Sequence, residues 1–259
     1  MKFNIVSQNQ RFIQFCKYLK EDEHQVVIVN GEFSECDVMI YDTHFKQQLA
    51  GVRDCLRIEL TDAQKGEDFC LSFNQVPGAY QIQDSCLLLG QGQKLEELVC
   101  DIVAVDQDLN KVKYIDRYMN MNYKVRFFGN QSINTYNYCG VIRGKQISNA
   151  YASAKVSICL NKQSVLMALE SGGNVITDSD YGLGLLSEQV FYDEEDFYEK
   201  VDAVLNGNYQ DATELRNRLL KDRSPFSIWA DIFKQIGLEK ASQRIGKKGE
   251  SVLNALYFK

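Results

Sequence analysis

The sequence predicts an α/β protein with two Rossmann-like domains that face a cleft, the first of them short. Short β-rich runs alternate with helix-like segments in both halves of the chain, which is typical of parallel sheets with crossover helices. The alternation breaks at Gly90-Gln91-Gly92 and restarts at Asp101. We therefore expect a first domain over residues 1–95, a second over 96–236 and a helical, basic tail over 237–259.

The first domain begins with a strand-helix-strand pattern. Lys2 to Val6 is the first predicted strand, and apolar residues at helical spacing predict a helix over 11–20. Further strands are expected at 25–29 and 36–41. No G-x-G-x-x-G fingerprint accompanies them, so a dinucleotide cofactor is not expected. The short β-like runs between 56 and 89 cannot be placed in order from the sequence.

The second domain repeats the alternation more clearly. Its predicted strands and helices are, in chain order, strand 101–105, helix 108–121, strand 125–128, helix 146–154, strand 156–160, helix 163–171 and strand 174–177. A short strand at 189–192 and helices to about 205, over 211–222 and over 225–236 are expected to follow.

Composition narrows the classes of function. The 259 residues carry a formal net charge of −6, which disfavours a broad nucleic-acid-binding surface without excluding DNA or RNA. The eight cysteines are scattered singly, without C-x-x-C pairs or nearby histidines, so no metal site is expected. The same pattern predicts a reducing, cytoplasmic compartment. No apolar run approaches the roughly 20 residues of a membrane span.

Polar residues follow the predicted strands of the second domain, at the edge where parallel sheets bind ligands. Arg143 and Lys145 could hold a diphosphate, since a guanidinium chelates phosphate and an ammonium adds a point charge. Asn161 to Ser164 lie where a strand meets a helix N-terminus, which attracts anions, although Ser164 could also be the N-cap of that helix. The alternative for Arg143 and Lys145 is an ordinary solvated loop.

Two strand ends of the first domain carry candidate catalytic and acceptor-side residues. Asp42 and His44 follow the third strand, and either could remove a proton from an acceptor hydroxyl. Capping of the strand end is the alternative role. Ser7, Gln8 and Asn9 follow the first strand and are expected to contact the acceptor.

Residues 100–236 resemble the carboxy-terminal domain of GT-B glycosyltransferases, in particular the CgeB-like branch of family 1-type enzymes. The resemblance rests on VRFFGN (125–130), YASAKVSICLN (151–161), ALESGGNVITD (168–178) and VFYDEEDFYEKVDAVL (190–205). It implies that the strand ends of this domain bind a nucleotide-sugar and that the amino-terminal domain binds the acceptor. The donor-binding set would be Gly129, Asn130, Arg143, Lys145, Asn161, Lys162, Gln163, Ser164 and Glu170.

The match departs from the family at two positions. Aligning Gly172 with the family glycine puts Ser164 where an arginine usually stands and Met167 where a glutamate holds the donor ribose. Glu170 is the nearest acidic substitute. The function predicted is metal-independent transfer of a sugar from a nucleotide-sugar to an acceptor hydroxyl, with no cofactor. The acceptor could be a glycan, a protein or a small molecule. A homo-oligomer is also compatible with the sequence. The alternatives are a non-catalytic nucleotide- or sugar-binding module and a structural or assembly protein.

Overall fold

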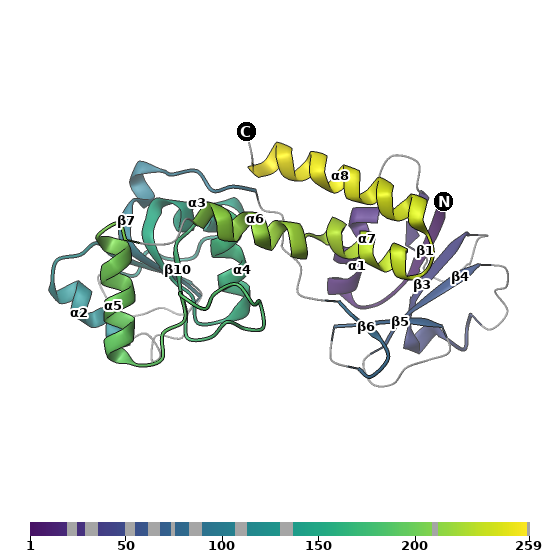
Figure 1. Ribbon diagram of the computed structural model, residues 1–259, viewed down its shortest axis with the longest axis horizontal. Coiled ribbons are helices and arrows are strands. Elements are labelled where there is room, and N and C mark those ends of the chain that lie inside the picture. The colour runs from purple at the N-terminus through teal and green to yellow at the C-terminus, as the bar shows by residue number, and fades with distance from the viewer. Residues whose placement is uncertain are drawn as a thin grey trace. The chain divides into compact units, whose positions relative to one another are not determined.

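The computed structural model describes residues 1–19, 25–28, 36–49, 55–61, 68–73, 76–82, 90–106, 113–129, 137–208 and 212–257. The chain divides into two compact units, each of them discontinuous in sequence (Figure 1). Unit 1 comprises residues 1–85 and 223–252, and unit 2 comprises residues 86–222 and 253–259. Among the described helices, none has both the length and the apolar composition needed to cross a bilayer.

Unit 1 is built on a parallel six-stranded sheet with the strand order β2-β1-β3-β4-β5-β6. The strands are β1 (Lys2–Val6), β2 (Gln25–Ile28), β3 (Val38–Asp42), β4 (Leu56–Leu60), β5 (Phe69–Ser72) and β6 (Tyr80–Gln81). Ile5 of β1 pairs with Ile28 on one side and with Ile40 on the other. Every residue of β3 is buried, as expected for a central strand covered on both faces.

Helices from both ends of the described chain pack in unit 1. They are α1 (Gln10–Cys16) with the 3₁₀ turns η1 (Lys17–Leu19) and η2 (Thr43–Phe45), then α7 (Pro225–Gln235) and most of α8 (Glu239–Tyr257). The Trp229 ring of α7 stacks on Phe15 of α1 at a centroid distance of 4.8 Å, and its Nε1 donates to the Phe15 carbonyl at 3.1 Å. Phe233 packs against Phe3 of β1 at 5.8 Å. These buried aromatic contacts hold the returning chain against the first strand and helix.

Unit 2 contains a parallel four-stranded sheet with the order β10-β9-β7-β8. The strands are β7 (Cys100–Val105), β8 (Val125–Phe128), β9 (Ala154–Ile158) and β10 (Val175–Ile176). Single bridges extend the sheet at both edges, because Thr177 pairs with Val190 beyond β10 and Phe127 pairs with Tyr138 beyond β8.

Two layers of helices cover the unit 2 sheet. The layers contain η3 (Glu96–Leu98), η5 (Lys113–Ile115), α2 (Asp116–Asn120), α3 (Lys145–Ser153), α4 (Lys162–Ser171), α5 (Glu194–Leu205) and α6 (Ala212–Arg223). Buried residues of α3, α4 and α6 share one core with β7, whereas those of α2 and α5 share the other. Helix α4 ends where Gly172 adopts a φ of +86°, a left-handed conformation that suits glycine.

The predicted fold class is confirmed: the chain is α/β, with a parallel Rossmann-like sheet in each unit. Two details differ from expectation. The strand predicted at 189–192 is a single bridge at Val190. The helix predicted at 225–236 was expected in the second domain, yet α7 lies in unit 1 because its aromatic face complements Phe3 and Phe15. Unit 1 is thereby larger than the short domain expected.

Candidate functional site

Each sheet has one pair of neighbouring strands whose following connections run in opposite directions. In unit 2, β7 leads to β8 on one side, whereas β9 leads to β10 on the other. In unit 1, β1 and β3 have the same relation, since they lead to β2 and β4. Ligands of open parallel sheets bind outside the carboxyl ends of such a strand pair. A ligand site is therefore expected at the carboxyl ends of β7 and β9 or of β1 and β3.

The N-terminus of α4 lies just beyond the carboxyl end of β9. Asn161 has extended backbone angles (φ −153°, ψ 154°), and its Oδ1 accepts from the Ser164 N–H at 2.8 Å. Ser164 donates its hydroxyl back to the Asn161 carbonyl at 2.8 Å. The N-cap is therefore Asn161, and the expectation that Ser164 caps the helix is wrong, because Ser164 already lies within the first turn. Lys162 and Gln163 follow the cap, where backbone N–H groups lack intrahelical acceptors and favour an anion.

A buried, uncharged cluster lies beneath this helix end. Burial raises the pKa of the Cys159 thiol to about 12. Burial likewise raises the pKa of the Tyr151 hydroxyl well above its ordinary value. Both groups are neutral at pH 7, so they add no negative charge that would repel an anion at the helix end.

The carboxyl end of β7 carries Asp106, which the sequence reading overlooked. Asp106 has a φ of +51°, and its N–H donates to the Phe128 carbonyl at 2.8 Å. The neighbouring Gly129 has a φ of +152°, and a Cβ added there would lie 2.7 Å from Asp106 Oδ1. Gly129 thus allows the ends of β7 and β8 to approach closely. An exposed carboxylate in a strained conformation at this position is typical of functional sites.

The loop after β10 is folded around the Asp180 carboxylate. Its oxygens accept from the backbone N–H groups of Gly184 (2.7 Å), Leu185 (3.1 Å) and Leu186 (3.0 Å). Burial by itself raises the pKa of Asp180, but the N–H donors, Gly184 foremost, outweigh it and the pKa lies below its ordinary value. This loop is therefore organised by its own backbone.

Arg143 and Lys145 lie at the start of α3, and both are exposed. The Lys145 ammonium donates to the Gln91 carbonyl at 2.5 Å, which ties the incoming chain to α3. The Arg143 N–H lies 3.4 Å from Gln146 Oε1. This hydrogen bond directs the Lys145 ammonium toward Gln91.

Glu170 lies at the opposite end of α4 from Asn161, about 13 Å along the helix axis. Its side chain is fully buried, and the carboxylate accepts a hydrogen bond from the Tyr257 hydroxyl. The same hydroxyl accepts from the Gly90 N–H at 3.1 Å. The structure therefore does not bring Glu170 together with Asn161 to Ser164. Met167 is buried in the same core, and Asn130 lies outside the described residues.

The structure does bring together the candidates of unit 1. Asp42 is 7% exposed, and its carboxylate accepts from the Ser7 hydroxyl at 2.8 and 2.9 Å and from the Gln8 N–H at 2.8 Å. Asn9 donates its N–H to Ser7 Oγ at 3.0 Å and caps α1 by accepting from Phe12 N at 3.2 Å. His44 lies exposed in the turn η2. Asp42 thus performs the strand-end capping that was the alternative to catalysis, and His44 is the accessible member of the pair.

Glu59 is a second residue that the sequence reading overlooked. It is 2% exposed, and its carboxylate accepts from Thr43 Oγ1 at 3.0 Å and from Lys46 Nζ at 3.1 Å. These contacts hold both ends of the turn that carries His44. The available signal was weak: Glu59 alternates with apolar residues in Leu56 to Leu60, as Arg57 also does.

Within the described ranges, no group of three or more His, Cys, Asp or Glu residues has the arrangement of a metal site.

Comparison with known proteins identifies the fold. No protein-family model matches the chain, and no curated protein sequence does so significantly. The spinosyn forosaminyltransferase SpnP superposes with a TM-score of 0.52 at 10% identity, covering 91% of this chain and 99% of its own. A protein assigned as a UDP-N-acetylglucosamine 2-epimerase from Listeria monocytogenes gives a TM-score of 0.53 at 8% identity, covering 91% of this chain and 96% of its own. The chain therefore has a GT-B-like fold of two Rossmann-like domains.

Proposed function

We propose that the chain is a glycosyltransferase, in which unit 2 binds a nucleotide-sugar donor and unit 1 binds the acceptor. The fold supports this proposal, since SpnP is named as a sugar transferase. The second similar structure is named for a reaction on UDP-N-acetylglucosamine, a nucleotide-sugar. The observation that carries the proposal is the N-terminus of α4 at the β7/β9 strand pair.

The leaving diphosphate is the group that this helix end suits. Negative charge develops on the diphosphate as the glycosidic bond to the donor breaks, and preorganised N–H groups stabilise such charge. The first-turn N–H groups of Lys162 and Gln163 and the Lys162 ammonium are assigned this role. Arg143, exposed at the start of α3, is a further candidate for phosphate contact. We propose that these groups stabilise the leaving diphosphate in a metal-independent transfer.

The donor ribose requires a different partner from the one that the sequence indicated. Glu170 is bound to Tyr257 at the far end of α4. Asp106 lies at the carboxyl end of β7, and a carboxylate can accept hydrogen bonds from both ribose hydroxyls. We assign ribose recognition to Asp106 in place of Glu170.

His44 is the proposed general base in unit 1. Both Asp42 oxygens accept hydrogen bonds from the Ser7–Gln8 segment, which disfavours that carboxylate for proton removal. The His44 imidazole is exposed, and its ring nitrogen can accept a proton from an acceptor hydroxyl. Glu59 positions the turn on which His44 lies.

A non-catalytic nucleotide-sugar-binding module is the second candidate. The burial of Ser164 and Met167 favours it, because the two family positions that contact the donor are here inside the protein. A structural or assembly role is the third reading.

Thermal unfolding and calorimetry with uridine, guanosine and thymidine diphosphates and their sugar conjugates test the proposal. A ligand that binds the folded chain raises its melting temperature. Release of nucleoside diphosphate from the sugar conjugate, with acceptors supplied, then separates a transferase from a binding module. If the chain binds none of these ligands, both the transferase and the binding module are overturned.

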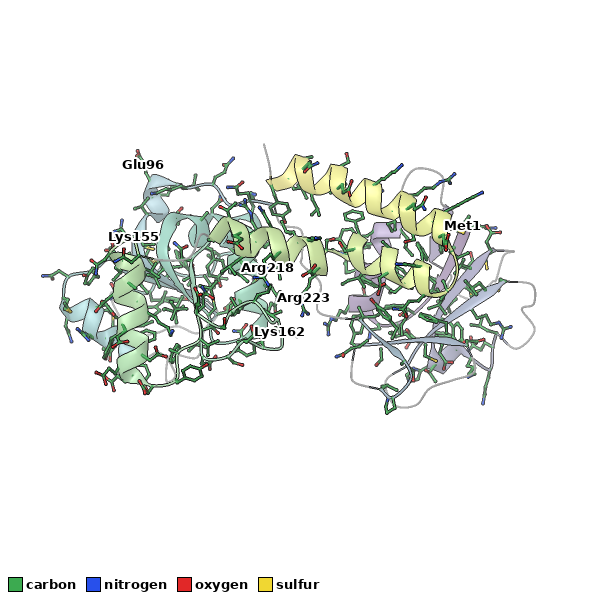
Figure 2. All side chains as sticks on the ribbon, viewed as in Figure 1. Met1, Glu96, Lys155, Lys162, Arg218 and Arg223 are labelled. Atoms are coloured by element: carbon green, nitrogen blue, oxygen red, sulfur yellow. The ribbon has the colours of Figure 1, made fainter. Side chains whose placement is uncertain are left out.

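Two lysines provide a matched pair of variants, Lys155 at the start of β9 and Lys162 beyond the end of that strand (Figure 2). Lys162→Ala should weaken diphosphate binding about tenfold, since one charge-assisted hydrogen bond contributes roughly 1.5 kcal/mol. Lys155 lies at the other end of the strand, in an exposed ion pair of 2.7 Å with Asp101, and Lys155→Ala should leave the affinity unchanged. Equal losses of diphosphate affinity in the two variants would mean that the α4 N-terminus does not bind the diphosphate.

A further inference from the structure

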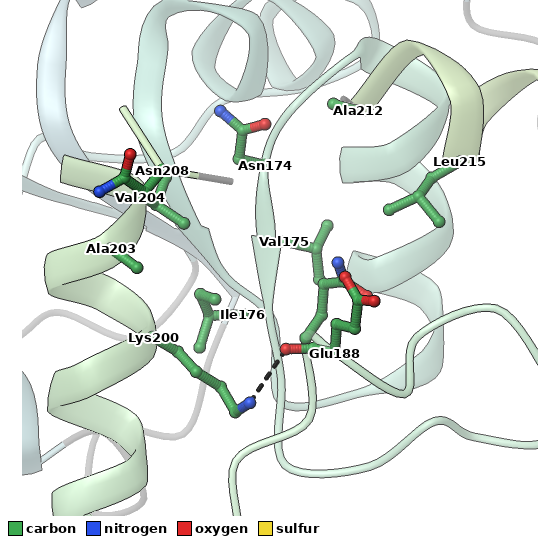
Figure 3. Close-up of a pocket in the computed structure, with 11 residues that line it drawn as sticks. Asn174, Val175, Ile176, Glu188, Lys200, Ala203, Val204, Asn208, Ala212 and Leu215 are labelled. Carbon is green, nitrogen blue, oxygen red and sulfur yellow. Dashed lines mark hydrogen bonds between the residues drawn. The ribbon is translucent and has the colours of Figure 1, made fainter. Parts of the chain in front are cut away.

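Two features of the described structure are not part of the strand-end sites: a cavity in unit 2 and a pair of cysteines in unit 1. The cavity has a volume of about 340 Å³ and is lined by residues of β10, α5 and α6 (Figure 3). Its Lys200 ammonium donates to the Glu188 carbonyl at 3.0 Å, and none of the described residues that line it is a cysteine or a histidine. The cysteine pair, in contrast, brings two reactive side chains together.

Cys36 and Cys55 stand just before two neighbouring strands of unit 1. Val38 of β3 pairs in parallel with Leu56 of β4, and the Leu56 N–H donates to the Asp37 carbonyl at 3.0 Å. This register puts Cys55 opposite Asp37, one residue from Cys36. At the usual strand spacing and rise, the Cα atoms of the two cysteines are then about 6 Å apart, a separation that a disulfide can span.

The side chains of both cysteines lie on the same side of the sheet. Each is partly exposed, and each packs against the buried cluster of Val6, Met39, Tyr41 and Leu49. Burial raises the pKa of the Cys36 thiol to about 11, and the charge of Cys55 and a hydrogen bond with its side chain add to the increase. A hydrogen bond that raises the pKa of a thiol is one in which that thiol is the donor. The Cys36 S–H therefore points to the Cys55 sulfur.

We propose that Cys36 and Cys55 are a site of reversible oxidation, at which a hydroperoxide converts the two thiols into an intramolecular disulfide. Cys55 is the attacking sulfur, because the Cys36 S–H stabilises negative charge on it by donating a hydrogen bond. Cys36 keeps its proton until it reacts with the oxidised Cys55. The pair lies at the amino-terminal edge of the sheet, away from the strand ends that carry Ser7 and Asp42.

The oxidation takes two steps. The Cys55 thiolate attacks one oxygen of hydrogen peroxide, the O–O bond breaks, and the departing hydroxide takes up the proton that Cys55 released and leaves as water. Cys55 is then a sulfenic acid. The Cys36 sulfur attacks the Cys55 sulfur, the S–S bond forms, and the S–O bond breaks as hydroxide leaves with the Cys36 proton as a second water. The two thiols together lose two electrons, and hydrogen peroxide gains them.

The disulfide closes the chain segment from Cys36 to Cys55, which contains β3 and the turn η2 that carries His44. Closing this segment restricts the unfolded chain, so the oxidised protein should be the more stable form. We expect oxidation to raise the melting temperature by several degrees, and a dithiol reductant to reverse the change. An unchanged melting temperature of the oxidised chain overturns this stabilisation.

Peptide mapping of the full chain tests the disulfide itself. Reduced protein is treated with hydrogen peroxide, its free thiols are alkylated, and it is cleaved with trypsin without reduction. The expected peptides 21–46 and 54–57 each contain one cysteine of the pair. We expect the two to be linked and to separate on reduction. Cys100 and Cys139 are the internal control: Cys100 lies on β7 and Cys139 lies beyond β8, so β8 separates them and no link is expected.

Two results of this mapping would overturn the proposal. One is that peptides 21–46 and 54–57 stay unlinked at a peroxide concentration that oxidises the exposed Cys139. The other is that the link forms in urea but not in the folded chain. The mapping uses the unaltered protein, so it decides the question even if a variant fails to fold. It involves no nucleotide, so its result is independent of the proposed glycosyl transfer.

Two serine variants separate the roles of the cysteines. In Cys36→Ser the Cys55 sulfenic acid has no thiol to react with, so dimedone, which traps sulfenic acids, should label Cys55. In Cys55→Ser the protonated Cys36 should remain unlabelled at the same peroxide concentration. Equal labelling in the two variants contradicts the assigned roles. Circular dichroism of both variants checks that they remain folded.

Discussion

Both sheets bring two loops together at the carboxyl ends of one strand pair, but the hydrogen bonds of these loops differ between the two units. At the β1/β3 pair, the Asp42 carboxylate links one loop to the other through Ser7 and Gln8. At the β7/β9 pair, Asn161 and Ser164 bond each other at the start of their own helix. Topology thus brings the loop pairs together in both units, and side-chain chemistry decides whether a pair is cross-linked or keeps a helix end suited to an anion.

Removing the cross-link in unit 1 should produce the largest change. Asp42→Ala leaves the Ser7 hydroxyl and the Gln8 N–H without their charged acceptor, so we expect a loss of about 3 kcal/mol in the free energy of unfolding. Urea unfolding followed by circular dichroism measures it. Asp37, exposed at the other end of β3, accepts one bond from Lys2 N, and Asp37→Ala should cost about 0.5 kcal/mol. Similar losses in the two variants would mean that Asp42 does not link the loops.

The two asparagine N-caps allow the units to be compared directly. Asn9→Ala and Asn161→Ala should each cost about 1 kcal/mol of stability, since each removes a side-chain acceptor from a helix start. Asp is an equally good N-cap, so both Asn→Asp variants should retain stability. Only Asn161→Asp should weaken nucleotide diphosphate binding, by about tenfold, because it adds a negative charge beside the proposed phosphate site. A matching loss in Asn9→Asp would place the anion site elsewhere.

The Asp180 carboxylate organises a single loop, whereas the Asp42 carboxylate links two. We therefore expect Asp180 to contribute less than Asp42 to the free energy of unfolding. Asp180→Asn should cost about 1 kcal/mol at pH 7, a modest value because solvent screens this partly exposed group. The folded-state pKa lies below the ordinary 3.8, so the contribution is present above that pH and is lost as pH falls through the folded value. Wild type and variant should therefore converge in stability once the pH falls below the folded-state pKa of Asp180. Glu97→Gln, at an exposed site, is the control, and a stability difference that persists in acid would contradict this account.

The smallest effect on stability is expected at Asp106. Asp106→Gly relieves a left-handed backbone but adds flexibility to the unfolded chain, so the free energy of unfolding should change by less than about 1 kcal/mol. Nucleotide affinity should nevertheless fall about tenfold if the carboxylate accepts from the ribose. Ser7, which follows β1 as Asp106 follows β7, should behave oppositely: Ser7→Gly loses its bond to Asp42 and destabilises without altering nucleotide affinity. Unchanged nucleotide affinity in Asp106→Gly would mean that another residue binds the ribose.

The sequence predicted regular elements well because their periodicity is local. The helices expected at 146–154 and 163–171 occupy 145–153 and 162–171. The N-cap was misplaced because asparagine and serine are both good caps and stand three residues apart. The bridge at Val190 looked like a strand because Val190, Phe191 and Tyr192 are three consecutive β-formers.

The candidate site was harder to predict because its decisive features are not local. The sequence suggested that Glu170 could bind a ligand. In the structure its carboxylate instead accepts a hydrogen bond from Tyr257, which lies 87 residues later. The left-handed backbone of Asp106 has no sequence signature, since aspartate adopts ordinary conformations in most positions. The link from Asp42 to Ser7 spans 35 residues and requires the strand order β1-β3, which the sequence did not establish.

The stacking of Trp229 on Phe15 has a consequence for biosynthesis. The indole reaches its partner only after a further 214 residues have been translated, which at typical rates takes roughly 10–40 s. During that interval the nascent first sheet presents the aromatic surface that α7 later covers. The sheet of unit 1, translated before that of unit 2, is therefore completed after it, and chaperone binding to ribosome-bound chains should persist until α7 emerges.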